Sequence, residues 1–96
     1  MKVKRIIWLP EIEQKLASKH GVVVPEVEDV LFSNPRTRFV ETGNREDEDV
    51  YAAYSQTEEG RYLIVFFILK RGSAALILSA REMDEKERQR YVRTKS

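Results

Sequence analysis

Eight consecutive apolar or aromatic residues, YLIVFFIL, occupy positions 62–69. A run of this length, rich in β-branched and aromatic side chains, predicts a central β-strand that is covered on both faces. The residues KRGS at positions 70–73 predict a tight turn, and AALILS at positions 74–79 predicts a second buried strand. We therefore expect these two strands to be adjacent and antiparallel in the interior of a sheet.

Weaker segments are expected to complete this sheet. Residues 50–56, VYAAYSQ, alternate between two sets of side chains and predict a half-buried strand. Residues 36–42 predict a weaker strand that ends at a Gly-Asn pair, and residues 2–8 predict a short strand at the N-terminus. Residues 45–49 read as an acidic loop.

Three helices are expected around the strands. The first covers residues 10–20, where a proline suits the first helical position and Gly21 supplies a left-handed stop after two cationic residues. The second covers residues 25–33 and has apolar residues at spacings of three and four. A final helix opens with the D-x-x-E capping pair formed by Asp84 and Glu87 and runs to about residue 93.

These elements predict one α+β domain over residues 1–96. The expected architecture is an antiparallel sheet of four or so strands, with an N-terminal helical hairpin packed on one face and a short C-terminal helix. No apolar run is long enough for a membrane span or a signal peptide, so a soluble, cytoplasmic protein without membrane contact is expected. The absence of cysteine excludes disulfides, thiolate zinc sites and a cysteine nucleophile, and it fits a reducing cytosol.

The net charge is only +1, but the charges are unevenly distributed. Residues 41–59 hold seven acids and one base, whereas residues 81–96 hold six bases and four acids. Such runs are either solvated surface or two binding faces, one for phosphates and one for a basic partner segment.

Two positions carry candidate chemistry before any resemblance is considered. His20 is the only histidine, and its side chain is the one whose ordinary pKa lies near neutrality. It could be an acid–base catalyst or simply a cation that caps the helix end, and a single histidine without cysteine gives no metal-ligand spacing. Arg81 follows a buried strand and could bind phosphate at the rim of the sheet, or pair with Glu82 or Glu85.

Arg88 and Tyr91 lie three residues apart on the final helix and should project from the same side. A guanidinium beside a phenol suits phosphate binding or base stacking, and it equally suits docking of the helix on the sheet. No glycine-rich phosphate loop, G-x-S-x-G elbow or H-E-x-x-H motif is present, and no metal or other cofactor is indicated.

Three segments resemble the BrnT family of ribonuclease toxins. Residues 19–22, Lys-His-Gly-Val, match its K-H-G-V/I element, and Trp8 matches the aromatic residue of its E-W-D opening. Residues 79–81, Ser-Ala-Arg, followed by Glu-Arg at 87–88 and by Tyr91, match its S-A-R … E-R-x-x-Y ending. The resemblance covers nearly the whole chain in the same order.

This resemblance implies a RelE/ParE-like fold and a type II toxin that cleaves RNA without a metal. It also implies a co-encoded antitoxin with a DNA-binding domain and an oligomeric complex with that antitoxin. Position by position, it makes His20 an acid–base candidate, Lys19 and Arg81 stabilisers of phosphate charge, and Arg88 and Tyr91 further RNA contacts. On this basis His20 and Arg81 are expected to share one phosphate site.

Two positions depart from the family pattern. Leu9 follows Trp8 where an aspartate is usual, and Leu76 stands where an arginine often precedes the S-A-R element. Phosphate stabilisation could then be relocated to Arg61, Lys70 or Arg71. The alternative to a ribonuclease is a non-catalytic protein-interaction or nucleic-acid-binding module that retains the toxin fold.

Overall fold

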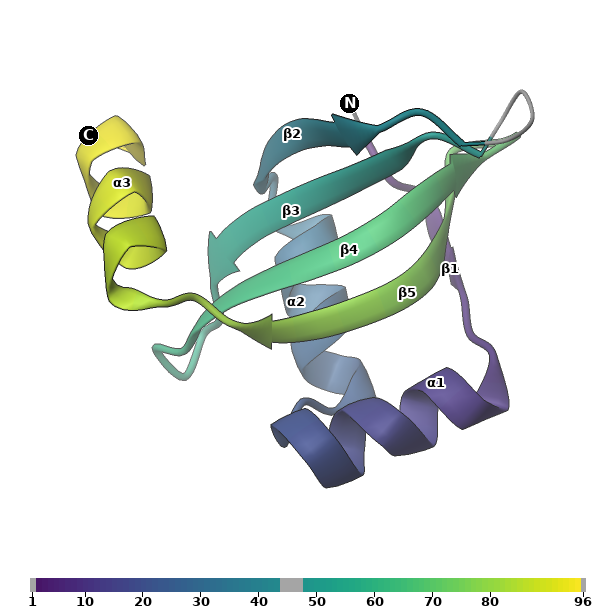
Figure 1. The fold of residues 1–96 in the computed structure, drawn as a ribbon, viewed down its shortest axis with the longest axis horizontal. Coiled ribbons are helices and arrows are strands. Elements are labelled where there is room, and N and C mark those ends of the chain that lie inside the picture. Colours follow the sequence, from purple (N-terminus) through teal and green to yellow (C-terminus); the bar gives the residue numbers. More distant parts are fainter. Residues whose placement is uncertain (1, 44–47, 96) are drawn as a thin grey trace.

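The structure, a computed structural model, describes residues 2–43 and 48–95 of the chain. Along the chain it forms β1 (Arg5–Ile7), α1 (Pro10–Lys15), a helical turn of π geometry termed η1 (Leu16–His20), α2 (Val24–Phe32), β2 (Arg36–Glu41), β3 (Val50–Gln56), β4 (Tyr62–Lys70), β5 (Ala74–Glu82) and α3 (Glu85–Lys95) (Figure 1). Most of the acidic loop expected over residues 45–49 lies outside the described residues.

The strands form one five-stranded sheet in the order β1-β5-β4-β3-β2. The neighbours β2–β3, β3–β4 and β4–β5 are antiparallel, whereas β1 pairs with β5 in parallel. Four strands, β2 to β5, are antiparallel as expected, but the sheet has a fifth strand, and the parallel pairing of β1 makes it mixed, which was not expected. After β1 the chain passes through two helices and enters the sheet again at the opposite edge, as β2. The later strand β5 then pairs with β1, and no local sequence pattern predicts this long-range pairing.

The central pair of strands is confirmed as predicted. β4 lies between β5 and β3, and β5 lies between β1 and β4. The turn between them places Gly72 at φ 75° and Ser73 at φ 59°. Two consecutive residues in the left-handed region match the twist of a tight antiparallel connection, and a glycine takes one of those positions without steric cost.

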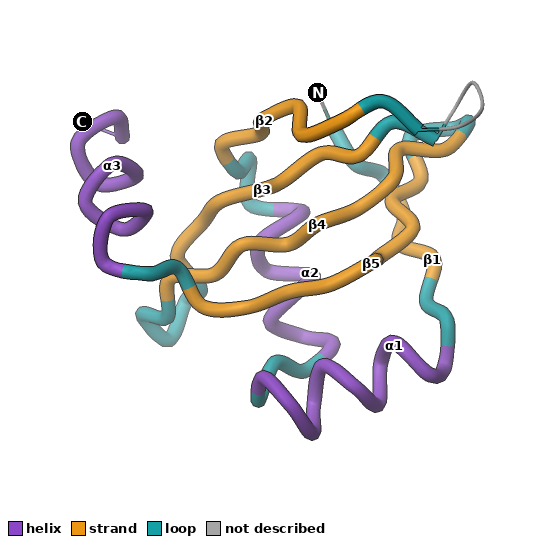
Figure 2. The backbone as a smooth tube through the Cα atoms, in the orientation of Figure 1, coloured by secondary structure: helices purple, strands orange, loops and turns teal. Residues whose placement is uncertain are grey.

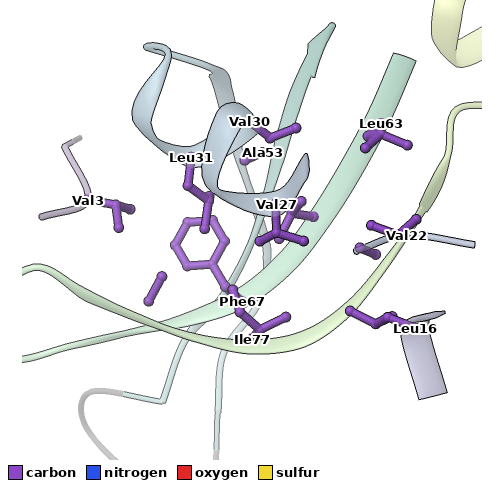
Figure 3. Close-up of a cluster of buried hydrophobic side chains, with 13 residues drawn as sticks. Val3, Leu16, Val22, Val27, Val30, Leu31, Ala53, Leu63, Phe67 and Ile77 are labelled. Atoms are coloured by element: carbon purple, nitrogen blue, oxygen red, sulfur yellow. The ribbon is translucent and has the colours of Figure 1, made fainter. Parts of the chain in front are cut away.

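One face of the sheet carries the main hydrophobic core (Figure 3). Helical residues such as Leu16, Val27 and Val30 pack there against Phe67 and Ile77 of the sheet. The segment α1–η1 lies against β5 and α2 lies against β3 and β4. Figure 1 shows the two helices running in different directions, so the expected helical hairpin is not confirmed, although both helices cover the same face.

The opposite face is covered by α3 at one end only. Tyr91 of α3 packs with Met83, Ile64 and Ala52 in a second cluster on this face. Figures 1 and 2 show α3 beside the end of the sheet where β5 finishes, with no other described helix in front of β3, β4 and β5. We call this surface the open face.

Two predicted helix signals are confirmed. Gly21 follows η1 in the left-handed conformation with φ 62°, and its backbone N–H donates to the Leu16 carbonyl. Before α3, the Asp84 N–H donates to Glu87 Oε1 and the Glu87 N–H donates to Asp84 Oδ1, each over 2.8 Å. Within the described residues, no helix is long and apolar enough to cross a membrane.

Candidate functional site

A cleft of about 410 Å³ lies between β2 and α3. We call it the β2–α3 cleft. Its lining consists of three arginines, one carboxylate, two tyrosines and two threonines: Arg36, Arg38, Arg90, Glu87, Tyr54, Tyr91, Thr37 and Thr94. The cleft therefore combines positive charge with two phenol rings at the covered end of the open face.

Strand alternation explains why two arginines point into this cleft. Arg36 pairs with Tyr54 and Arg38 pairs with Ala52 of β3. Ala52 and Tyr54 belong to the cluster beneath α3, so residues of β2 in register with them share that face. Arg90 comes from α3, and in the part of the chain that the structure describes none of these three arginines has an ion-pair partner.

Arg81 is held at the rim of the cleft by Glu87. Its two terminal nitrogens donate to Glu87 Oε1 and Oε2 over 2.8 and 2.9 Å, a bidentate pair. These hydrogen bonds raise the pKa of Arg81 and lower the pKa of the Glu87 carboxyl below its ordinary value. The partner is thus neither of the expected carboxylates, because the Glu82 group that accepts from Arg81 is its backbone carbonyl, at 3.1 Å.

Arg88 and Tyr91 do project from the same side of α3, and both meet Tyr62. The Arg88 guanidinium carbon lies 4.3 Å from the centroid of the Tyr62 ring, a cation–π contact. The Tyr91 ring meets Tyr62 edge-on at 6.0 Å and is only 8% exposed. Tyr91 therefore docks α3 on the sheet and also lines the cleft, whereas Arg88 lies outside the cleft lining.

Arg61 binds residues on the side of the sheet that α1 and α2 cover. It donates to both carboxylate oxygens of Glu26, at 2.8 and 2.6 Å, and to the Gly21 carbonyl at 2.9 Å. The Glu26 side chain is 14% exposed and also accepts from the Val23 N–H at 3.2 Å. We call these groups the Arg61 clamp; they tie the residue before β4 to the junction between η1 and α2.

The remaining predicted site residues lie apart from the cleft. Lys19 and His20 are exposed and end η1, a segment that packs through Leu16 in the main core, on the side of the sheet opposite Tyr91 of α3. Arg71 lies in the turn after β4, and a nine-residue strand of about 30 Å separates this turn from Arg61. The Arg81 guanidinium is directed to Glu87 beneath α3, so the structure does not bring it onto the face that carries His20.

Sequence reasoning missed Arg36, Arg38, Arg90 and Tyr54. The R-x-R spacing of the first two on a predicted strand was an available signal, because alternate residues of a strand share a face. The contribution of α3 was not available from local pattern, since it depends on where the helix docks. Among residues 2–43 and 48–95, no group of three or more His, Asp or Glu side chains could hold a metal ion.

These features define a small α+β protein with an arginine-lined cleft, a surface suited to a polyanionic backbone. A family model described as "Ribonuclease toxin, BrnT, of type II toxin-antitoxin system" matches residues 8–87. The chain belongs to this BrnT family of ribonuclease toxins. The matched region begins at Trp8 and ends at Glu87, so it includes Lys19, His20 and Arg81.

The fold is similar to a solved structure of that family. The 1.1 Å crystal structure of the ribonuclease toxin BrnT from Brucella abortus aligns with a TM-score of 0.60 over 86% of this chain and 100% of its own. The two sequences are 20% identical, so this likeness concerns the fold. No curated protein matches the chain.

Proposed function

We propose that this chain is an RNA-cleaving toxin that works without a metal ion and holds the RNA backbone in the β2–α3 cleft. The observation that carries the proposal is the set of three cleft arginines without an ion-pair partner among the described residues. An arginine presents a planar fork of donors that matches phosphate oxygens. The single carboxylate of the cleft is kept ionised by Arg81.

The chemistry follows from what RNA cleavage without a metal needs. The ribose 2′-oxygen attacks the adjacent phosphorus while the bond to the 5′-oxygen breaks, which leaves a cyclic phosphate and a 5′-hydroxyl. Arg36, Arg38 and Arg81 stabilise the extra negative charge on the phosphorus oxygens in the transition state. Glu87 accepts the proton of the 2′-hydroxyl, and the Tyr54 phenol donates a proton to the leaving oxygen.

The finer assignments belong to the same proposal. Residues 1–96 act as one toxin domain of RelE/ParE-like architecture, in the cytoplasm. The family implies an antitoxin partner. An antitoxin that covers the cleft would block RNA, and the complex would form the functional oligomer. The resemblance gives His20 an acid–base role and Lys19 a phosphate-binding role. Both roles require that RNA also contacts the end of η1, on the other side of the sheet.

The experiment compares RNA cleavage in EDTA by wild type, Arg38→Ala and Arg36→Ala. Loss of one transition-state cation should lower the rate by about 10²–10³-fold, because such donors act on charge that develops during reaction. Arg71→Ala, which removes an exposed arginine at the far end of β4, is the matched control and should keep full activity. Wild-type rates for both cleft variants, with folding confirmed by circular dichroism, would refute the proposed cleft.

A second candidate, a non-catalytic interaction module, is favoured by Leu76. Leu76 is an aliphatic side chain at the position where the motif of the family that the chain resembles often has an arginine. A wild-type protein that binds RNA or the antitoxin but leaves RNA intact, with and without EDTA, would establish this alternative.

A further inference from the structure

Four aliphatic side chains form a continuous row across the open face. Register pairs Ile7 of β1 with Leu76 of β5, Leu76 with Ile68 of β4, and Ile68 with Val50 of β3. Each is the sequence neighbour of a residue that packs into the main core on the opposite face, namely Ile6, Ala75, Phe67 and Tyr51. Alternation therefore directs all four outward, and we call them the apolar row.

No described helix lies over the apolar row. Ile7 is 37% exposed, and the other three are half-buried although they lie in or beside the centre of the sheet. Figure 1 shows α3 at the other end of the sheet from the β4–β5 turn, near which the row lies. With strands about 4.8 Å apart, the row spans about 14 Å, enough for one side of a helix.

A second row on the same face carries positive charge. Register places Arg81, Ile64, Tyr54 and Arg36 side by side across β5, β4, β3 and β2. Ile64 and Ile68 are four residues apart on β4, so the two rows are separated by about 13 Å along the strands. At the arginine end α3 packs on Ile64 through Tyr91, and Arg36 at the β2 edge stays exposed beside it.

We infer that the antitoxin implied by the family docks on the open face through an acidic amphipathic helix. Apolar side chains of this helix rest on the apolar row, and carboxylates about nine residues away reach Arg36, because a helix rises about 1.5 Å per residue. Arg36 has no ion-pair partner among the described residues, whereas Arg81 already binds Glu87. The inference rests on the proposed function in one respect only, namely that the chain has an antitoxin. It explains how one partner could close the cleft and also bury Leu76.

Other occupants fit the two rows less well. An RNA backbone would match the arginines but would lose phosphate hydration over four aliphatic side chains without compensation. A second copy of this chain would bring an equally cationic row to the arginines. Charge complementarity therefore favours a partner that carries acids and an apolar stripe.

The test measures the affinity of the antitoxin, purified from the reading frame beside the toxin gene, for variants of the apolar row. Leu76→Gln and Ile7→Gln should each weaken the complex by about tenfold or more, since a buried apolar contact is replaced by a polar one. Leu76→Met should restore affinity. Phe32→Gln is the matched control, because Phe32 is 51% exposed on α2, which covers the other face.

Methyl NMR of Ile7, Val50, Ile68 and Leu76 adds a readout that does not depend on any variant. These methyl groups should shift on addition of the antitoxin and show contacts to it. Wild-type affinity for both glutamine variants, unshifted methyl groups, or the absence of any complex would overturn the inference. Shifts produced by a non-cleavable RNA or by self-association alone would overturn it in favour of that occupant.

The same samples separate this inference from the proposed ribonuclease. RNA cleavage by free wild type and by Leu76→Gln should be equal, because Leu76 does not line the cleft. An inert wild type that still binds antitoxin through the apolar row would remove the ribonuclease and leave the docking surface. If wild type cleaves RNA and both glutamine variants bind the antitoxin as tightly as wild type does, the ribonuclease is supported and the docking surface is wrong.

Discussion

The Arg61 clamp and the β2–α3 cleft use the same side chain for opposite purposes. Arg61 is surrounded by acceptors on the main-core side of the molecule, where Glu26 and the Gly21 carbonyl take its donors. Arg38 has no ion-pair partner among the residues that the structure describes, and it faces the β2–α3 cleft, whose other side is α3. An arginine that the fold places beside a buried carboxylate is thus structural, whereas one without such a partner is available for a ligand.

Arg81 stands between these two cases, and its substitution should have the largest effect. It is paired with Glu87, yet the pair lies at the edge of the cleft, where a phosphate could share the guanidinium. Arg81→Ala should lower RNA cleavage by about 10²–10³-fold, measured under single-turnover conditions in EDTA.

A lysine at this position is the informative control. Arg81→Lys keeps the charge but loses the bidentate geometry, so it should recover only part of the rate. If Arg81→Ala instead lowers the melting temperature strongly while the folded fraction cleaves RNA normally, Arg81 would belong with Arg61 as a structural residue.

Arg61→Ala should act on stability and leave the chemistry intact. The substitution leaves the largely buried Glu26 carboxylate without its main partner, which should cost about 1–3 kcal/mol in the free energy of unfolding. Urea titration of Arg61→Ala, Glu26→Ala and the double variant measures the coupling between the two side chains. RNA cleavage by the folded variants should stay within about threefold of wild type, since such a residual change is of the order of RT.

A stable Arg61→Ala protein that has lost RNA cleavage would contradict the structural role of Arg61. It would mean that Arg61 exchanges Glu26 for phosphate when RNA binds. The site would then extend to the layer that carries Lys19 and His20.

Local patterns predicted what depends on local physics. The apolar run at 62–69, the left-handed Gly21 and the reciprocal capping of Asp84 and Glu87 all involve neighbours in sequence, and all appear as expected. The parallel pairing of β1 with β5 and the partner of Arg81 depend on where distant segments meet. Composition cannot supply that information, because several carboxylates near Arg81 offer the same charge.

The candidate site divides in the same way. The resemblance predicted Arg81 and Tyr91 as site residues. Tyr91 lines the β2–α3 cleft, and Arg81 binds Glu87, which also lines it. The resemblance did not identify Arg36 and Arg38, because the register of β2 against β3 decides which face they take. A strand shifted by one residue would direct both arginines to the main-core face.

The smallest effect is expected for His20→Ala. His20 is exposed at the end of η1, on the side of the sheet opposite Tyr91 of α3, so its removal should change RNA cleavage by less than about tenfold, below the range of a general base. The pH dependence of the rate distinguishes the two candidate bases without relying on the size of that change. A base must be deprotonated to act, so the rate falls as the pH decreases through its pKa.

The hydrogen bonds from Arg81 lower the pKa of the Glu87 carboxyl, so Glu87 stays deprotonated and a rate that depends on it stays level as the pH falls from neutral toward the ordinary carboxyl range. Single-turnover rates between pH 4.5 and 8, at about half-unit steps, should therefore be level for wild type and for His20→Ala, and Glu87→Gln should be slow throughout. A wild-type rate that falls near neutrality, and a flat low profile in His20→Ala, would assign the base to His20. The end of η1 and the Arg81–Glu87 pair would then have to approach each other around bound RNA, as a phosphate site shared by His20 and Arg81 requires.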